Sequence, residues 1–222
     1  SHLKKFPYWL KQSVKDNESF ARTRGLISQL GLNTVCQSAR CPNIYDCFSV
    51  KRCTFLILGK FCTRTCNFCA VEKKKMELEK PDKEELLKIK EAVEKLDIKN
   101  VVITSVTRDD LVDGGSSHFA DCISILRGIG RGLKIEVLIP DFLGDKSSIE
   151  KIISRKPDVF SHNLETAPRL YSKVRPQADY NRSIEVLRYA KELDSSIITK
   201  SGIMAGLGES REEIRNVMQD LR

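Results

Sequence analysis

Two cysteine triplets give this 222-residue chain its strongest chemical signal, because six of its eight cysteines belong to them. The triplets are Cys36, Cys41 and Cys47, followed by Cys62, Cys66 and Cys69. Cysteine thiolates normally hold a [4Fe–4S] cluster four at a time. The three thiols of the second triplet, spaced C-x3-C-x2-C, would therefore leave one iron open to an exogenous ligand. We interpret both triplets as iron–sulfur sites.

Zinc, a disulfide and unpaired buried thiols are the alternatives for the second triplet. A structural zinc site needs four ligands, usually as paired C-x2-C or Cys/His knuckles. The C-x2-C pair Cys66 and Cys69 has no second pair at knuckle distance, and the histidines are isolated in the sequence. A charge-rich chain of this length also needs no disulfides to fold. A zinc-stabilised binding module is the alternative from a different class, and visible absorption by an iron–sulfur cluster would exclude it.

The other two cysteines, Cys53 and Cys122, are predicted to have packing roles. Cys53 opens a short apolar segment, and Cys122 shares a helical face with Phe119, Ile123 and Leu126. Free cysteine packs as a small hydrophobic residue. We therefore expect both thiols to be buried and to ligate nothing.

Composition describes an ordinary globular protein with a basic surface. The hydrophobic fraction is 41%, and the formal net charge is +8 at pH 7. The basic residues are scattered apart from Lys73-Lys74-Lys75, where no aromatic residue is interleaved. We interpret that run as a solvated loop and predict no nucleic-acid partner. No run of about 18 apolar residues occurs, so no membrane span is predicted.

Beyond residue 52, short apolar segments alternate with amphipathic ones, a pattern typical of βα units around a parallel sheet. Strands are predicted at 53–59, 100–105, 134–139, 158–161 and 196–200. Apolar residues at helical spacing predict helices around 86–96, 119–126 and 214–221. The expected fold is α/β, a partial (β/α) barrel over residues 52–222. Residues 1–51 do not follow the repeat and form an N-terminal extension that carries the first triplet.

In a barrel of this kind, chemistry takes place at the carboxyl ends of the strands, on the loops that follow them. The second triplet directly follows the first predicted strand. The same rim should carry polar residues from later strands, namely Thr104, Ser105, Asn163, Glu165 and Lys200. We expect these side chains to surround one site with the cysteine loop.

The C-x3-C-x2-C loop, with Phe68 just before its last cysteine, resembles the signature of the radical SAM superfamily. The resemblance implies a [4Fe–4S] cluster on Cys62, Cys66 and Cys69, with S-adenosylmethionine on the open iron. Two further groups of residues would then contact that cofactor. Asn163 and Glu165 could hydrogen-bond its ribose, and Arg175 or Lys200 could take its carboxylate, although a salt bridge on the rim is the alternative for each. The segment Gly202-Ile-Met-Ala-Gly206, with Met204, resembles the segment that packs against adenine, and Phe68, Thr104 and Ser105 complete the predicted cofactor site.

The first triplet is less diagnostic by spacing alone, but its neighbourhood resembles the auxiliary-cluster motif of the lipoyl synthases. The resemblance extends from about Pro7 to Arg222. It rests on the segments Cys36-Gln-Ser-Ala-Arg-Cys41-Pro-Asn-Ile-Tyr-Asp-Cys47, Thr104-Ser-Val-Thr-Arg-Asp-Asp110, Asp113-Gly-Gly115, Glu136-Val-Leu-Ile-Pro-Asp-Phe142, His162-Asn-Leu-Glu-Thr166, Val174-Arg-Pro176 and Thr199-Lys-Ser-Gly202 through Glu209.

This resemblance implies a radical SAM sulfurtransferase of lipoate biosynthesis. Such an enzyme inserts two sulfur atoms, at C6 and C8 of an octanoyl chain that is amide-linked to a protein lysine. It would hold two [4Fe–4S] clusters, with the auxiliary cluster on Cys36, Cys41 and Cys47 as the sulfur source. The implied partners are octanoylated lipoyl domains of 2-oxoacid dehydrogenases or the glycine cleavage H protein, and a reductant such as ferredoxin or flavodoxin. A bacterial cytoplasmic location is expected, or a mitochondrial or plastid one in a eukaryote.

The chain departs from the family pattern at its C-terminal end, Leu221-Arg222. The family's Arg-Ser-Ser segment, whose serine ligates the auxiliary cluster, has no counterpart here, and a sixth strand is also expected to be missing. A second enzyme-class hypothesis keeps the radical SAM core but makes the first cluster an electron relay or a substrate anchor. Loss of sulfide during one turnover would separate the two hypotheses.

Overall fold

One five-stranded parallel sheet organises the molecule. The structure, a computed structural model, describes residues 17–74, 78–130 and 132–222. Neighbouring strands follow chain order and all pair in parallel. The strands are β1 (Thr54–Ile57), β2 (Asn100–Ser105), β3 (Lys134–Leu138), β4 (Val159–Ser161) and β5 (Ile198–Lys200). All five were predicted within a few residues, and the expected α/β partial barrel is confirmed.

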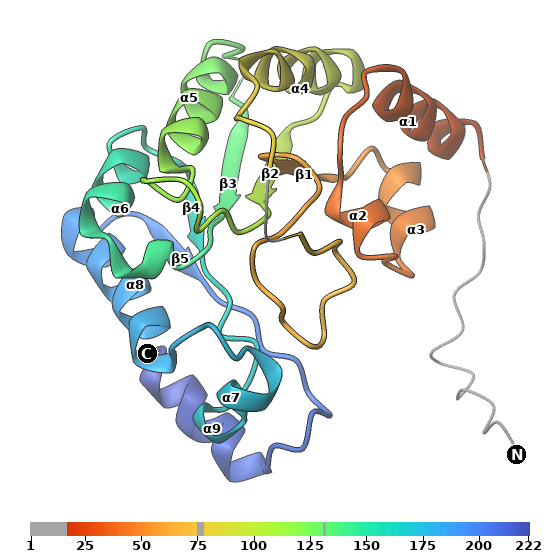
Figure 1. Cartoon of the computed structure of the whole chain (residues 1–222). Helices are drawn as coiled ribbons and strands as arrows, with labels where there is room; N and C mark the ends of the chain where they lie inside the picture. Colours follow the sequence, from red (N-terminus) through yellow and green to blue (C-terminus); the bar gives the residue numbers. More distant parts are fainter. Residues whose placement is uncertain (1–16, 75–77, 131) are drawn as a thin grey trace, which may run out of the picture.

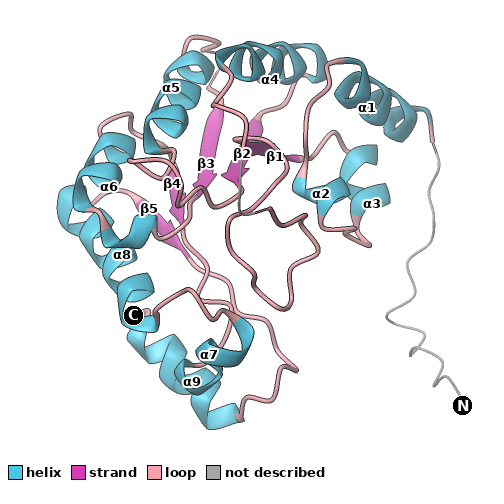
Figure 2. Cartoon of the chain, in the orientation of Figure 1, coloured by secondary structure: helices cyan, strands magenta, loops and turns pink. Residues whose placement is uncertain are grey.

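Helices cover the outer side of this sheet. Figure 1 shows the strands following an arc, with α4 (Lys83–Leu96), α5 (Ser116–Arg127), α6 (Lys146–Ile153) and α8 (Tyr180–Leu193) outside it. Figure 2 shows the same two layers by secondary structure. The helix patterns predicted around 86–96, 119–126 and 214–221 correspond to α4, α5 and α9 (Arg211–Asp220). Short connections add α7 (Tyr171–Val174) and the 3-10 turns η2 (Phe142–Gly144) and η3 (Pro168–Leu170).

The core fills the space between sheet and helices. Side chains along a strand alternate between the two faces of a sheet. Phe55, Ile103, Ile135, Val137 and Phe160 are fully buried strand residues within the main hydrophobic cluster. Cys122 of α5 is 1% exposed, as its place on an apolar face predicted. Burial at these alternate positions leaves the other face of the sheet to line the interior of the arc.

Residues 17–51 form a small helical layer beside β1, while residues 1–16 of the predicted extension lie outside the described residues. Its helices are α1 (Glu18–Gln29), α2 (Val35–Ser38) and α3 (Ile44–Ser49). The rings of Phe20 and Tyr45 stack with centroids 5.0 Å apart, which joins α1 to α3. An antiparallel bridge between Thr34 and Phe55 joins this layer to β1. The first cysteine triplet is thereby held against the edge of the sheet.

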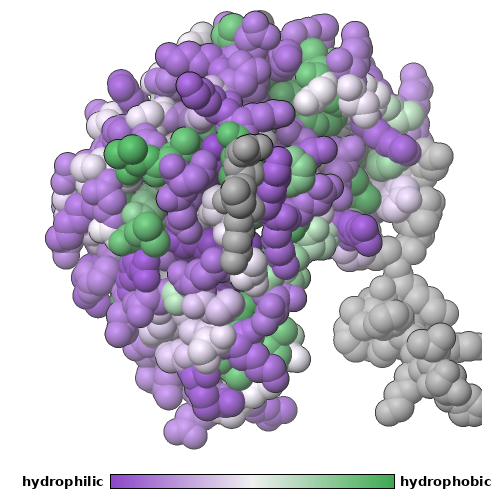
Figure 3. All heavy atoms as spheres, viewed as in Figure 1, coloured by the Kyte–Doolittle hydropathy of each residue, from purple (hydrophilic) through white to green (hydrophobic). Residues whose placement is uncertain are grey.

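The surface of the molecule is mainly polar. Figure 3 shows a largely hydrophilic face with hydrophobic side chains in small separate groups. Among the described residues, no helix has both the length and the apolar character needed to span a lipid bilayer. Lys73 and Lys74 are exposed, as predicted for a solvated loop, and Lys75 lies outside the described residues.

Candidate iron–sulfur and cofactor site

The second cysteine triplet lies on the loop that follows β1, at the carboxyl end of the strand. Hydrogen bonds from Cys62 N to Glu72 O (2.8 Å) and from Lys74 N to Cys62 O (3.1 Å) close the base of this loop. Cys62, Cys66 and Cys69 are all partly buried and form no disulfide. Three thiols on one short, partly exposed loop fit a cluster that keeps one iron accessible. We call residues 62–69 the cluster loop.

The thiols of the cluster loop sit in a mixed electrostatic environment. Burial raises the pKa of the Cys66 thiol, and the neighbouring thiols of Cys62 and Cys69 raise it further. The guanidinium of Arg175 acts in the opposite direction. A bound metal requires the thiolate form. Arg175 therefore lies close enough to favour the ionised state of Cys66 at the loop.

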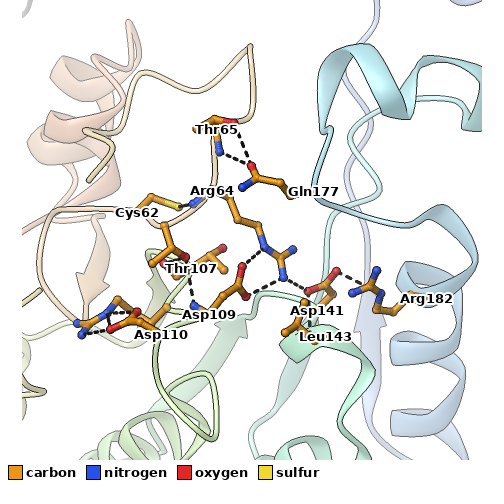
Figure 4. Close-up of polar contacts among 12 residues, drawn as sticks. Cys62, Arg64, Thr65, Thr107, Asp109, Asp110, Asp141, Leu143, Gln177 and Arg182 are labelled. Atoms are coloured by element: carbon orange, nitrogen blue, oxygen red, sulfur yellow. Dashed lines mark hydrogen bonds and ion pairs between the residues drawn. The ribbon is translucent and has the colours of Figure 1, made fainter. Parts of the chain in front are cut away.

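Arg64, the middle residue of the C-x3-C spacing, reaches away from the thiols into a pair of carboxylates (Figure 4). Its Nε and Nη2 donate to Asp109 at 2.7 and 2.9 Å, and Nη2 also donates to Asp141 at 2.6 Å. The Arg64 side chain is 4% exposed and Asp141 is fully buried. Burial alone would raise the pKa of Asp141, but its hydrogen bond to Arg64 lowers that pKa overall. Arg182 of α8 lies 3.7 Å from the second oxygen of Asp141.

Further hydrogen bonds attach the cluster loop on two sides. Thr63 N and Thr63 Oγ1 both donate to Thr107 O at 3.0 Å, in the loop after β2. On the other side, Thr65 N donates to Gln177 Oε1 at 2.6 Å (Figure 4). Asn67 N donates to Val174 O at 3.0 Å. The loop is therefore held between the β2 end of the sheet and the α7–α8 connection.

The loop after β4 brings Asn163, Glu165 and Arg175 together. Arg175 Nη1 donates to the carbonyl of Asn163 at 2.7 Å, and its guanidinium lies 5.4 Å from the ring centroid of Tyr171. Burial raises the pKa of the Glu165 carboxyl, while a hydrogen bond from Asn163 and the charge of Arg175 oppose this shift. Glu165 also has a left-handed backbone, with φ of 66°. A strained, partly buried carboxylate beside an amide and a cation is typical of a ligand site.

The segment predicted to face adenine runs beside this loop. Glu165 N donates to Gly202 O at 2.9 Å, and Met204 N donates to Glu165 O at 2.8 Å. A Cβ added at Gly202 would come within 3.0 Å of Asn163 Oδ1. Glycine at this position therefore allows the two loops to approach closely. Met204 is placed next to Glu165 by its backbone.

Lys200, Thr104 and Ser105 also reach the rim, and the first two have partners within the protein. Lys200 Nζ lies 2.8 Å from Glu136 Oε1, which is the rim salt bridge that the sequence left open as an alternative. Thr104 Oγ1 donates to Leu138 O at 2.7 Å. Ser105 Oγ is buried without a hydrogen-bond partner. Phe68 on the cluster loop is 37% exposed, so its ring is available for contact with a bound molecule.

The first triplet lies on α2, α3 and the turn between them. Cys36, Cys41 and Cys47 are partly buried and form no disulfide. Burial raises the pKa of Cys36, and the thiols of Cys47 and Cys41 raise it further, which indicates that the three thiols lie near one another. Cys36 and Cys47 line a cavity of about 510 Å³ together with Cys53. Cys41 does not line this cavity, so two of the three partly buried thiols face it, an arrangement that fits an iron–sulfur cluster at its edge.

Across residues 17–74, 78–130 and 132–222, no three cysteine, histidine or carboxylate side chains converge tightly enough to hold a single metal ion. Cys53 is 7% exposed, in agreement with the predicted buried thiol.

Sequence reasoning missed the residues that hold the cluster loop, namely Arg64, Asp109, Asp141, Gln177 and Arg182. A signal was available only in part. Arg64 lies between Cys62 and Cys66, which were predicted to be ligands, and Asp109 and Asp141 each follow a predicted strand. Charged residues at strand ends near a cysteine loop could have been proposed as partners, but pairing across 77 positions cannot be read from spacing.

Comparison with known proteins agrees with this geometry. The model of the radical SAM superfamily matches residues 56–221. The chain is 53% identical to a lipoyl synthase of Caldicellulosiruptor saccharolyticus, over 98% of this chain and 76% of that protein. It is 46% identical to a lipoyl synthase of Alkaliphilus metalliredigens, over all of this chain and 76% of that protein.

Solved structures with low sequence identity share the fold. Methylornithine synthase (PylB) superposes with a TM-score of 0.58 at 18% identity, over 89% of this chain and 61% of that one. HydG, a maturase of the [FeFe]-hydrogenase, gives a TM-score of 0.61 at 16% identity, over 76% of this chain and 37% of that one. The superfamily match and the relatives at about half identity together lead to one conclusion: the chain belongs to the lipoyl synthase family of radical SAM enzymes.

Proposed function

We propose that this chain inserts two sulfur atoms, at C6 and C8, into an octanoyl chain carried on a lysine of a lipoyl domain. The observation that carries the proposal is the pair of partly buried cysteine triplets, in a chain 53% identical to a lipoyl synthase. A radical SAM enzyme of this family uses a [4Fe–4S] cluster and S-adenosylmethionine. The second cluster, held by Cys36, Cys41 and Cys47, is part of the proposal, as is its role as sulfur donor.

Residues 1–51 are proposed to serve as the auxiliary-cluster unit, and residues 52–222 as the radical SAM barrel. Cys62, Cys66 and Cys69 would ligate the first cluster and leave one iron to S-adenosylmethionine. When bound and reduced, these cofactors supply a 5′-deoxyadenosyl radical that abstracts hydrogen from an unactivated carbon. The protein must hold the target carbon near that radical and exclude water and oxidants.

The residues on the rim have distinct proposed tasks. Asn163 and Glu165 are placed to accept and donate hydrogen bonds at the ribose, since their side chains bond each other on the rim and burial raises the pKa of the partly buried Glu165 carboxyl. Arg175 orders the Asn163 carbonyl and brings positive charge to Cys66. It is therefore the rim cation best placed for the methionine carboxylate. Lys200 would need to exchange its Glu136 partner before serving the same purpose.

The remaining members of the predicted cofactor site have contact roles in this proposal. The backbone of Met204 and the close approach at Gly202 form a surface for adenine. Phe68 offers an exposed ring beside the last cysteine. Thr104 and Ser105 end β2 at the rim, where they are proposed to shape the floor of the cofactor site.

The partners follow from the proposed reaction. Octanoylated lipoyl domains of 2-oxoacid dehydrogenases or the glycine cleavage H protein are the proposed acceptors, and ferredoxin or flavodoxin is the proposed electron donor. A bacterial cytoplasmic location is also part of the proposal, and the bacterial source of the named relatives supports its first half. A role for the first cluster as an electron relay is the competing hypothesis. Sulfide lost from the protein in one turnover would favour the donor role, and retained sulfide would favour the relay.

Iron and acid-labile sulfide per chain test the proposed pair of clusters. After anaerobic reconstitution we expect about eight irons, falling to about four in Cys41→Ala, since a cubane holds four. Cys122→Ala is the matched control, because its thiol is equally a free cysteine but is buried in α5. This control should keep the iron content of the unmodified chain. A count of about four irons in both the unmodified chain and Cys41→Ala would contradict the second cluster.

A further inference from the structure

Arg64 occupies an unusual position, because a charged residue stands in the middle of the cluster loop and yet is 4% exposed. Its guanidinium makes three hydrogen bonds to two carboxylates, Asp109 and Asp141, at 2.6 to 2.9 Å. Burial opposes the charged form of Arg64, but these carboxylates raise its pKa overall. A cation already engaged in this way is not available to bind an incoming anion. The contact must serve something within the protein.

The partners of Arg64 come from separate parts of the barrel. Asp109 follows β2, Asp141 follows β3, and Arg182 of α8 approaches the far oxygen of Asp141 (Figure 4). Four alternating charges thus link the cluster loop to two strand ends and one outer helix. The hydrogen bonds of Arg64 reach Asp109, 45 positions away in the sequence, and Asp141, 77 positions away. Removing the guanidinium would break the links of the cluster loop to Asp109 and Asp141 and leave only the contact between Asp141 and Arg182.

The neighbours of Arg64 show what this link controls. The main-chain N–H of Arg64 lies 3.4 Å from Cys62 Sγ and donates to it. Thr63, one residue earlier, accepts a hydrogen bond from Asp109 N at 3.1 Å. The position of the Arg64 side chain therefore fixes the backbone from which the thiols project. Hydrogen bonds to cluster sulfurs also help to set the reduction potential.

We propose that Arg64 is a positioning residue, which holds the cluster loop in its ligand-binding conformation through Asp109, Asp141 and Arg182. It would act on the cluster through Cys62 and the loop backbone. The inference rests on the proposed ligation by Cys62, Cys66 and Cys69. The inference adds that contacts within the protein, and not the cluster alone, hold the loop in this conformation.

Arg64→Lys is the first test, because lysine keeps the charge but loses the planar fork that bonds two carboxylates. Arg108→Lys is the matched control. Arg108 is 3% exposed and forms the same kind of bidentate pair, with Asp110 two residues later, but its own side chain bonds Leu58 O and no residue of the cluster loop. Hydrogen exchange of residues 62–69 is measured in both variants. We expect faster exchange there in Arg64→Lys and unchanged exchange in Arg108→Lys.

The second readout is the EPR spectrum of the reduced protein with and without S-adenosylmethionine. In Arg64→Lys we expect iron bound by Cys62, Cys66 and Cys69 to be retained, the spectral change caused by S-adenosylmethionine to be weakened, and its reductive cleavage to slow. Misplacement of about 1 Å can cost about 100-fold in rate. Equal effects in Arg64→Lys and Arg108→Lys would overturn the proposal, as would wild-type exchange and spectra in Arg64→Lys.

A double variant separates positioning from fold stability. Arg64→Met leaves the buried carboxylate of Asp141 without its main partner, which lowers the melting temperature. Adding Asp141→Asn removes that charge, so the melting temperature should recover while the EPR response to S-adenosylmethionine stays weakened. Recovery of both would overturn the positioning role. Retention of all cluster iron in Cys66→Ala would instead contradict the ligand assignment on which the inference rests.

Discussion

At the scale of single residues, two deeply buried charges beside the cluster loop, Arg64 and Asp141, are paired with each other. The Asp141 carboxylate is fully buried, and the guanidinium of Arg64 balances its negative charge. His162 is 1% exposed and lies close to the cations Arg175 and Arg64. Its Nδ1 lies 2.9 Å from the carbonyl oxygen of Ile139, so Nδ1 carries the proton and donates, while Nε2 is buried without a partner. The ring is therefore held in the neutral form.

This neutral His162 should make the protein sensitive to acid. Burial lowers the pKa of His162 to about 4, and the charges of Arg175 and Arg64 add to the effect against the hydrogen bond to Ile139 and the charge of Asp141. An unfolded histidine has a pKa of about 6.5. Above pH 6.5 neither state binds the proton, so His162 does not change stability. As the pH falls from about 6.5 toward 4, only the unfolded state binds it, and stability is lost.

As the pH falls from about 7.5 to about 5, protonation of His162 in the unfolded state should lower the free energy of unfolding by about 2 kcal/mol. Urea unfolding at the two pH values measures this, and His162→Gln should reduce the loss by that amount, because glutamine can donate to Ile139 O but does not titrate. His118→Gln is the control, since His118 is also buried but is 3.1 Å from the carboxylate of Glu85. An unchanged pH dependence in His162→Gln would show that another group is responsible.

At the scale of elements, the site is built where loops after neighbouring strands continue to pair. His162 N donates to Lys200 O at 3.0 Å, just beyond β4 and β5, and the bonds between Glu165, Gly202 and Met204 extend this pairing. The loop after β4 therefore runs parallel to the loop after β5. The two loops are close enough that a Cβ at Gly202 would lie only 3.0 Å from Asn163 Oδ1.

Gly202→Ala should consequently disturb the cofactor site more than the fold. The new methyl group would lie 3.0 Å from Asn163 Oδ1 and 3.2 Å from its Cγ, so the amide must move. We expect the KM for S-adenosylmethionine to rise about tenfold, equivalent to about 1.4 kcal/mol of lost binding. Steady-state kinetics of its cleavage and a thermal melt of the same sample give the two quantities.

Gly25→Ala is the matched control for this substitution. Gly25 lies inside α1, and an added Cβ would meet nothing within 4 Å. Alanine there should stabilise the protein by about 0.5–1 kcal/mol, because glycine is a poor helix residue. Its KM for S-adenosylmethionine should not change. If Gly202→Ala also left the KM unchanged, Asn163 could not be a contact of the cofactor.

At the scale of the whole molecule, the sequence predicted what depends on local pattern. All five strands and the place of the cluster loop after β1 followed from short apolar segments and their order. The helical layer of residues 17–51 was predicted only as an extension, because its packing depends on contacts such as Phe20 with Tyr45. The pairing of Lys200 with Glu136, 64 positions apart, also needed the register of the sheet. Long-range pairs of charges have no periodic signal in a sequence.

The net charge of the molecule leads to the last prediction, which concerns its protein substrate. A chain with formal charge +8 attracts an acidic lipoyl domain over distances comparable to the Debye length. That length falls from about 30 Å at 0.01 M ionic strength to about 3 Å at 1 M. We therefore expect the Kd for an octanoylated acidic lipoyl domain to rise several-fold across this range, as measured by calorimetry or fluorescence anisotropy. A lipoyl domain with its surface carboxylates neutralised should lose most of this dependence. A Kd that did not change with ionic strength for either lipoyl domain would contradict this prediction. Apolar contacts and the octanoyl chain alone would then dock the substrate, and the basic surface would serve solubility.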